Sequence, residues 1–378
     1  MSKSDIARRL GVSRPTVIAW LEKKEYVDDR GWQDGVKRSH SDTEEERIVL
    51  LKKKRMEEKK FFLGAPYIRM DYAKAHPSDP LPSLWFVNET FRRHGLQTHE
   101  PKKRKKGQSI VSRLKFPIRS IISLGVIQQA SDFIGKKFIT GRTEPISIFS
   151  TAYYQGLSLY QIWRVSSETA ESAIGCLQRL WIETPVPQVM RMDNGMTFRG
   201  TGSGEAHIGR CVKFLLNLGV APLFSSPYQS YTNPHVEGHN RTFTEKLWTK
   251  YHFTSEAEID RECGRFNTES REYYAYACKE RLEKKGLRFL SPEQEISSAL
   301  LRSTKGKKLF FIRFVERWNE RDRACGVVIL NRFVVIKETF LNQYVFVALN
   351  LHTATLHVFS EHDGIATEIL RQPFPYTV

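Results

Sequence analysis

The chain has 378 residues and a formal net charge of +17 at pH 7, from 59 Lys and Arg side chains against 42 Asp and Glu. This length allows two or three domains, and a hydrophobic share of 40% is enough to fill their cores. The positive charge favours a polyanionic partner such as nucleic acid over an acidic small-molecule site. A mean hydropathy of −0.44 and the lack of a long apolar run exclude a membrane-spanning protein.

The cysteines and the N-terminus bear on the compartment. Five cysteines are scattered without any Cys-x-x-Cys pair, so neither a disulfide framework nor a zinc site is readable. The first residues, MSKSDIARRLGV, lack the apolar centre of a signal peptide. We therefore expect a cytoplasmic protein that makes no contact with a membrane.

The first predicted module covers residues 1–40 and is a helix-turn-helix. Residues 4–22 carry two short helical patterns around Gly11, which permits a tight turn, and Ser13 is a natural N-cap for the second helix. In such a motif the second helix enters a DNA groove. The candidate base-reading side chains are Arg14, Thr16 and Ile18. An ordinary helical hairpin is the alternative interpretation.

A second helical module is predicted over residues 41–100, followed by a basic linker over 101–112. Arg92 and Arg93 lie on the polar side of its last helix and are candidates for DNA contacts. In the linker, the stretch PKKRKKGQS has a composition suited to lying along phosphates. Its candidate residues are Lys102, Lys103, Arg104, Lys105 and Lys106. For the long charged helix that opens the module, a solvated face is the simpler reading.

Residues 113–285 have the alternation of an α/β domain. The predicted order is strands at 126–135, 145–154 and 157–163, a helix at 167–182, a strand at 187–193, a helix at 205–218, the short strand APLFSS and a helix that begins after Asn233. Such an order fits the ribonuclease-H-like arrangement, a mixed sheet with helices on its faces. After a linker at 286–308, short Val- and Ile-rich runs over 309–378 predict a small β-barrel.

Three acidic residues stand at element ends or inside a strand of the α/β region. Asp132 lies within the first strand, Asp193 closes the strand at 187–193, and Glu237 falls in the first turn of the helix that Asn233 and Pro234 start. Phosphodiester chemistry with two metal ions, roughly 4 Å apart, needs carboxylates from separate chain segments. Each acid by itself reads as a surface or helix-end charge, and the combination indicates a catalytic site.

These motifs resemble a known family, the DDE transposases and integrases with a retroviral-integrase-type catalytic core, in particular bacterial insertion-sequence transposases. The resemblance rests on SDFIG around Asp132, MRMDNGMTF around Asp193 and SSPYQSYTNPHVEGHNRTF around Glu237, together with the N-terminal helix-turn-helix and the C-terminal barrel. One difference is Gly238-His239, where relatives commonly carry Arg-Phe.

The resemblance implies a function for these residues. Asp132, Asp193 and Glu237 would bind two Mg²⁺ or Mn²⁺ ions, with Asp132 shared between them, and Asn240 and Arg241 would contact DNA. The implied reaction is cleavage of the element ends, followed by attack of the freed 3′-OH on target DNA. Terminal repeats and target DNA would be the partners, a homo-oligomer would assemble on them, and the protein would lie at the bacterial nucleoid. A required ATPase or targeting protein is left open.

Two other functions remain at this stage. A regulator derived from a transposase would keep the helix-turn-helix and the positive charge, and the intact set of three acids argues against it. A metal-dependent nuclease would hydrolyse strands without joining them, and only the fate of the 3′-OH separates it from a transposase.

Overall fold

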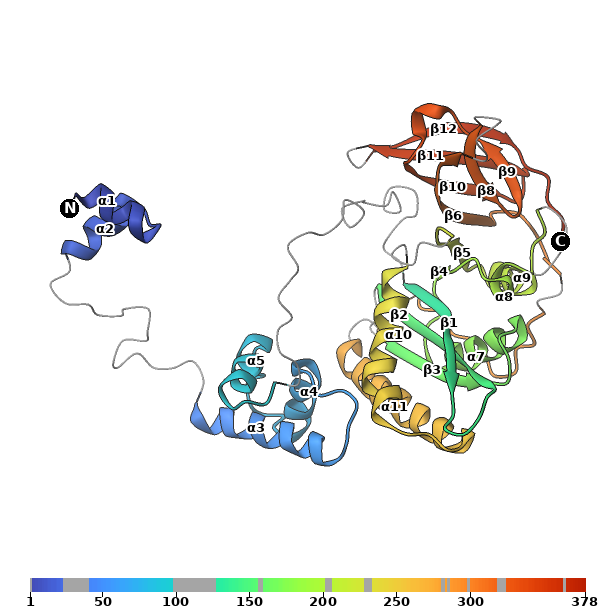
Figure 1. The fold of residues 1–378 in the computed structure, drawn as a ribbon. Helices are drawn as coiled ribbons and strands as arrows, with labels where there is room; N and C mark the ends of the chain where they lie inside the picture. The colour runs from blue at the N-terminus through green and yellow to red at the C-terminus, as the bar shows by residue number, and fades with distance from the viewer. Residues whose placement is uncertain are drawn as a thin grey trace.

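The computed structural model describes residues 2–22, 41–97, 127–155, 159–200, 206–227, 233–279, 283, 286–297, 300–317, 324–362 and 365–378. Figure 1 gives the course of the chain through these segments. Among them, no helix is both long and apolar enough to cross a membrane. All five cysteines are buried free thiols.

The N-terminal pair of helices follows the local rules of its sequence. Helix α1 (Lys3–Leu10) begins with a capping box between Ser2 and Asp5 and ends at Gly11, which has a φ of 67°. Helix α2 (Arg14–Glu22) begins after Ser13, whose hydroxyl accepts a hydrogen bond from the Thr16 backbone amide at 3.3 Å. Two helices with a tight turn at Gly11 are therefore confirmed.

Three further helices form a compact unit that is docked on the α/β region. They are α3 (Asp42–Glu57), α4 (Ala65–Ala75) and α5 (Leu84–Arg93). The segment between α3 and α4 reaches helix α11 (Glu256–Ala277), where the buried Glu269 carboxylate accepts hydrogen bonds from the backbone amides of Phe61 and Phe62. Both phenylalanine rings pack on Phe266. These helices therefore share an apolar core with the α/β region.

The centre of the molecule is a mixed sheet. Its first five strands are β1 (Gln128–Phe138), β2 (Pro145–Gln155), β3 (Leu159–Val165), β4 (Val189–Met192) and β5 (Ala221–Phe224), in the spatial order β3-β2-β1-β4-β5. Strands β1, β2 and β3 are antiparallel, whereas β4 is parallel to both β1 and β5. The prediction of an α/β region with a mixed sheet is confirmed.

Helices cover both faces of this sheet (Figure 1). Helices α10 (Pro234–Lys246) and α11 pack on one face through a core that contains Ile148, Ile162, Phe243 and Phe266. Helices α7 (Ala170–Glu183) and α9 (Arg210–Asn217) bury their apolar sides in a core on the other face. The short helix α8 (Met196–Arg199) connects the end of β4 to this second layer. The sheet is thus buried on both sides where β1 and β4 meet.

The C-terminal strands correct one expectation. They are β6 (Lys308–Phe314), β7 (Glu316–Arg317), β8 (Cys325–Ile329), β9 (Arg332–Val335), β10 (Tyr344–Asn350), β11 (Thr355–His362) and β12 (Ile365–Pro373). A 3₁₀ turn at Glu338–Phe340 lies between β9 and β10, and another at Trp248–Lys250 follows α10. Strand β6 pairs in parallel with β5, so β6, β10, β11 and β12 extend the central sheet to nine strands, and β7, β8 and β9 form a separate three-stranded sheet.

The β-barrel predicted over 309–378 is therefore not a separate unit in this structure. The free edge of β5 accepts β6 as a neighbour, because an unpaired strand edge leaves backbone amides and carbonyls without partners. Buried residues of the C-terminal strands and of the α/β region belong to one apolar core. The consequence is a direct structural path from the C-terminal strands to the end of β5.

Candidate active site

A cavity of about 660 Å³ opens where β4 and β5 end and α10 begins. All three predicted catalytic acids line it. Its walls are Asp132, Asp193, Asn194, Gly195, Met196, Arg199, Ser225, Ser226, Pro227, Asn233, Val236 and Glu237. Asp132 and Glu237 are 105 positions apart in the sequence, with Asp193 between them, and the fold brings all three acids to one cavity.

The strand register accounts for the first two acids. Ala130 of β1 lies opposite Arg191 of β4 in the parallel pair. Asp132 and Asp193 each come two residues later, and because side chains alternate along a strand, both carboxylates emerge on the same face. Asp132 is inside β1, opposite Ser150 of β2, and Asp193 follows the last residue of β4. The predicted positions of both acids in their elements are confirmed.

The third acid comes from the start of α10. Glu237 lies in the first turn of this helix and Pro234 is its first residue, as the sequence predicts. Asn233 occupies the N-cap position, but the expected side-chain capping bond is absent. Instead, the Asn233 side chain is buried at the cavity wall, and its Oδ1 atom has no hydrogen-bond partner. The cavity therefore holds an amide oxygen with unused acceptor capacity.

Burial and mutual repulsion dominate the electrostatics of the cavity. Burial, together with the negative charges of Asp193 and Glu237, raises the pKa of Asp132 to about 7, although hydrogen bonds from Phe133 and Asn240 act in the opposite direction. Burial also raises the pKa of Asp193. Among the residues that the structure describes, none forms an ion pair with these three acids, although Arg199 lines the same cavity. A cation bound between the carboxylates would relieve the cost of burying their charge.

Short hydrogen bonds orient the two aspartates. The Phe133 amide donates to Oδ1 of Asp132 at 2.8 Å, and the Asn240 side-chain amide donates to Oδ2 at 3.3 Å. The Gly195 amide donates to Oδ1 of Asp193 at 2.9 Å. Each carboxylate thus keeps acceptor capacity toward the cavity.

The donor set suits a hard divalent cation. Mg²⁺ prefers oxygen ligands and is usually bound by one or two carboxylates together with substrate phosphates. In the part of the chain that the structure describes, no group of three or more His, Cys, Asp and Glu side chains is close enough to hold one ion. Because Mg²⁺ is usually held by only one or two carboxylates, with phosphate oxygens as further ligands, a group of three such side chains around one ion is not required. The unpartnered, buried Oδ1 atoms of Asn233 and Asn240 are further acceptors beside the acids.

Helix α10 also places the other two residues that were predicted near the acids. Asn240 contacts Asp132, as described above, so it lies at the site. Arg241 is exposed. Within the described residues, the ion pair that a spacing of four residues allows between Glu237 and Arg241 is absent, which leaves Glu237 exposed at the cavity mouth.

The predicted DNA contacts outside the cavity have different surroundings. In α2, Arg14 is exposed, Ile18 is partly buried, and the Thr16 hydroxyl is hydrogen-bonded to Ser13 at 2.7 Å. In α5, Arg92 is paired with Glu89, and Arg93 lies 2.8 Å from Glu45. Acids of their own module therefore partly neutralise both α5 arginines. The basic run from Lys102 to Lys106 and the linker around it lie outside the described residues.

One residue near the cavity escaped the sequence analysis. Arg313 of β6 donates hydrogen bonds to the Asn194 side chain and to the Ser225 carbonyl, two groups that line the cavity. The only signal in the sequence is an arginine inside the apolar run LFFIRFV, where alternation alone does not reveal its partners.

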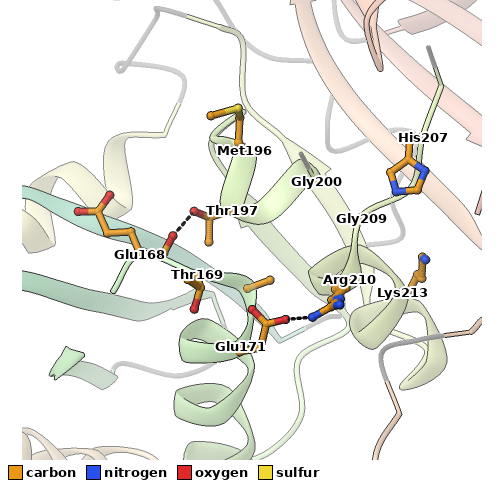
Figure 2. Close-up of a pocket in the computed structure, with 11 residues that line it drawn as sticks. Glu168, Thr169, Glu171, Met196, Thr197, Gly200, His207, Gly209, Arg210 and Lys213 are labelled. Atoms are coloured by element: carbon orange, nitrogen blue, oxygen red, sulfur yellow. Dashed lines mark hydrogen bonds and ion pairs between the residues drawn. The ribbon is translucent and has the colours of Figure 1, made fainter. Parts of the chain in front are cut away.

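A second pocket, of about 460 Å³, lies between α7, α8 and α9 (Figure 2). Glu171 and Arg210 form an ion pair at its floor, and the Thr197 hydroxyl donates to the Glu168 carbonyl at 2.7 Å. It shares only Met196 with the acidic cavity and contains none of the three predicted acids. The acidic cavity is therefore the candidate active site.

Comparisons with known proteins add little. No protein family and no curated protein matches the sequence. Among solved structures, a chain of the cryo-EM structure of the simian T-cell lymphotropic virus intasome in complex with PP2A regulatory subunit B56 gamma is similar over 66% of this chain and 78% of its own, at 12% identity and a TM-score of 0.30. Similarity at this level supports no conclusion about activity.

Proposed function

We propose that this protein is a DDE-type DNA transposase or integrase, in which Asp132, Asp193 and Glu237 are the catalytic, metal-binding residues. The observation that carries the proposal is the convergence of three acids, from β1, the end of β4 and the start of α10, on one cavity. The charges of the other two acids oppose ionisation of Asp132 there. Repulsion of this kind is typical of a site that is completed by cations.

In this proposal β1 to β5, with α7, α9, α10 and α11, form the ribonuclease-H-like core. Two Mg²⁺ or Mn²⁺ ions bound by the carboxylates would activate the attacking water or 3′-OH and stabilise the charge of the phosphate in the transition state. As the family resemblance implies, Asp132 would be shared by both ions. Asn240 and the Phe133 amide hold the Asp132 carboxylate in one orientation.

The remaining parts of the chain would bind DNA. Helix α2 would read the terminal repeats of the element through Arg14, Thr16 and Ile18, while basic residues of 101–112 and the C-terminal strands would hold phosphates. Two element ends must meet one target, so the working form would be a dimer or a larger homo-oligomer on DNA.

The test uses the purified full chain with Mg²⁺ or Mn²⁺ and DNA that carries the ends flanking its own gene, beside an Asp193→Asn variant. The expected result is nicks at the 3′ ends and joined products, both lost in the variant. Cleavage without joined products would show that the protein is a nuclease and not a transposase. If wild type and variant both bind DNA sequence-specifically and neither cleaves it in the presence of metal, the proposal of an enzyme is wrong and the alternative of a DNA-binding regulator is favoured.

A further inference from the structure

Arg313 of β6 is a fully buried arginine with an unusual set of partners. It is 4% exposed. Its Nε donates to the Val328 carbonyl at 2.9 Å, and Nη1 donates to the carbonyls of Ser225 and Ile312, both at 2.8 Å. Its Nη2 donates to the Oδ1 atom of Asn194 at 2.7 Å. All four acceptors are uncharged oxygens.

Burying the charge of Arg313 without an anionic partner costs free energy, so an arginine at this position needs a geometric reason. Among the described residues, no carboxylate forms an ion pair with Arg313. Burial and the charge of Arg199 lower its pKa to about 9. A buried cation without an anionic partner is normally avoided. Arginine differs from lysine in its planar fork of five donors, which can fix several acceptors at once.

The acceptors tie the C-terminal strands to the active-site cavity. Val328 belongs to β8, whereas Asn194 and Ser225 follow β4 and β5 and line the cavity. The Asn194 side-chain amide also donates to the Ser225 carbonyl, so Arg313, Asn194 and Ser225 form a closed set of three hydrogen bonds. Asn194 is the residue directly after Asp193. The turn that presents the Asp193 carboxylate is therefore fixed by a side chain from β6.

We infer that Arg313 is a positioning residue for the metal-binding acids, which makes the C-terminal strands a part of the catalytic site and not only a DNA-binding module. The inference rests on the proposed function above. Groups that orient metal ligands through hydrogen bonds typically contribute about 10–100-fold to metal affinity or activity. Arg313 would act in this way through Asn194, whose side chain it binds and which directly follows Asp193 in the chain.

The test compares full-chain variants Arg313→Met, Arg313→Lys and Asn194→Ala with Arg317→Met as the control. Arg317 is an exposed arginine of β7 that pairs with Glu338, so its loss removes a C-terminal positive charge that takes no part in the hydrogen-bond set. For each variant, cleavage of end DNA is measured as a function of Mn²⁺ and of DNA concentration. Asn194→Ala removes two of the three bonds of the set from a half-buried turn and leaves the Arg313 side chain in place, so it serves if Arg313→Met does not fold.

We expect Arg313→Met and Asn194→Ala to raise the Mn²⁺ concentration for half-maximal rate and lower kcat by about 10–100-fold, with KM for DNA within about twofold of wild type. Arg313→Lys should stay close to Arg313→Met, because one ammonium group cannot span Asn194, Ser225 and Val328. Arg317→Met should match wild type in the Mn²⁺ concentration for half-maximal rate and in kcat, and any effect of the lost positive charge should appear in KM for DNA alone.

Other outcomes overturn the inference. If Asn194→Ala or Arg313→Lys retains the wild-type Mn²⁺ dependence and kcat, Arg313 does not position the acids, although the proposed function stands. If the variants change KM for DNA alone, Arg313 serves DNA binding. If wild type itself shows no metal-dependent cleavage, the proposed function fails and this inference fails with it.

Discussion

Asp132 lies in surroundings that oppose its own charge. Burial and two neighbouring carboxylates raise its pKa from 3.8 to about 7. Between these pH values the folded protein binds more protons than the unfolded chain, so the free energy of unfolding falls as pH rises. Ionised Asp132 therefore lowers the free energy of unfolding at neutral pH. Such a loss of stability is common at positions where a residue is kept for its function.

We predict that Asp132→Asn is more stable than wild type in EDTA, with a difference that grows from near zero at pH 4 to on the order of 1–3 kcal/mol at pH 8. Urea denaturation at several pH values measures it. Asp260→Asn is the control, since Asp260 is an exposed carboxylate 2.7 Å from Arg164. It should change stability by less than about 1 kcal/mol. Equal stability of wild type and Asp132→Asn at pH 8 would contradict the prediction.

At the scale of elements, the close approach of α8 and α9 bears on the cavity wall. A Cβ atom added to Gly209, the N-cap of α9, would lie 2.4 Å from the Arg199 carbonyl and 2.6 Å from the Gly200 Cα. Both contacts are to backbone, so the two short helices must separate to accept a side chain. Arg199 lines the acidic cavity and would move with α8.

We predict that Gly209→Ala lowers the free energy of unfolding by about 1–3 kcal/mol and lowers cleavage activity. Gly175→Ala is the matched control, because Gly175 is inside α7 and a Cβ there meets no atom within 4 Å. It should stabilise by roughly 0.5–1 kcal/mol. Chemical denaturation and the cleavage assay measure both variants. If Gly209→Ala leaves the free energy of unfolding unchanged, α8 and α9 do not approach each other this closely.

The docking of α3, α4 and α5 on α11 depends on a buried acid. Glu269 accepts hydrogen bonds from the amides of Phe61 and Phe62 and lies 3.5 Å from Arg55. Its removal leaves two buried amides and a buried guanidinium without this partner. The remaining aromatic contacts cannot replace these hydrogen bonds.

We predict that Glu269→Ala destabilises the chain by about 3 kcal/mol and accelerates hydrogen exchange of the Phe61 and Phe62 amides. The control is Glu272→Ala on the same helix, whose exposed carboxylate lies 3.8 Å from Lys74. That pair should contribute about 0–1 kcal/mol. Unchanged exchange in Glu269→Ala would show that the helices dock by apolar contacts alone.

At the scale of the whole molecule, the proposed function assigns the net charge of +17 to DNA binding. A protein that neutralises 6–10 phosphates loses about 10³–10⁵ in affinity between 50 and 200 mM salt. We predict a loss of this size for nonspecific duplex DNA, measured by fluorescence anisotropy. Replacing Lys103, Arg104 and Lys105 by alanine should make the salt dependence shallower by about three charges. An unchanged slope would remove the linker from the DNA interface.

The sequence by itself determined the features that depend on near neighbours. The turn at Gly11, the cap at Ser13, the alternation of strands and helices, and the placing of Asp132, Asp193 and Glu237 in their elements follow from local periodicity and turn chemistry. Each of these features is set by backbone preferences within a few residues, so one sequence is enough to predict them.

Only the tertiary structure decided which distant groups meet. The pairing of β6 with β5, the docking of Phe61 on Glu269 and the bonds from Arg313 to Asn194 join residues that are at least 87 positions apart in the sequence. The sequence around Arg313 in its apolar strand, or around Asn233 before its helix, does not indicate whether the side chain faces water or a cavity. Burial distinguishes the two, because a buried polar group must find a partner that only the folded chain can supply.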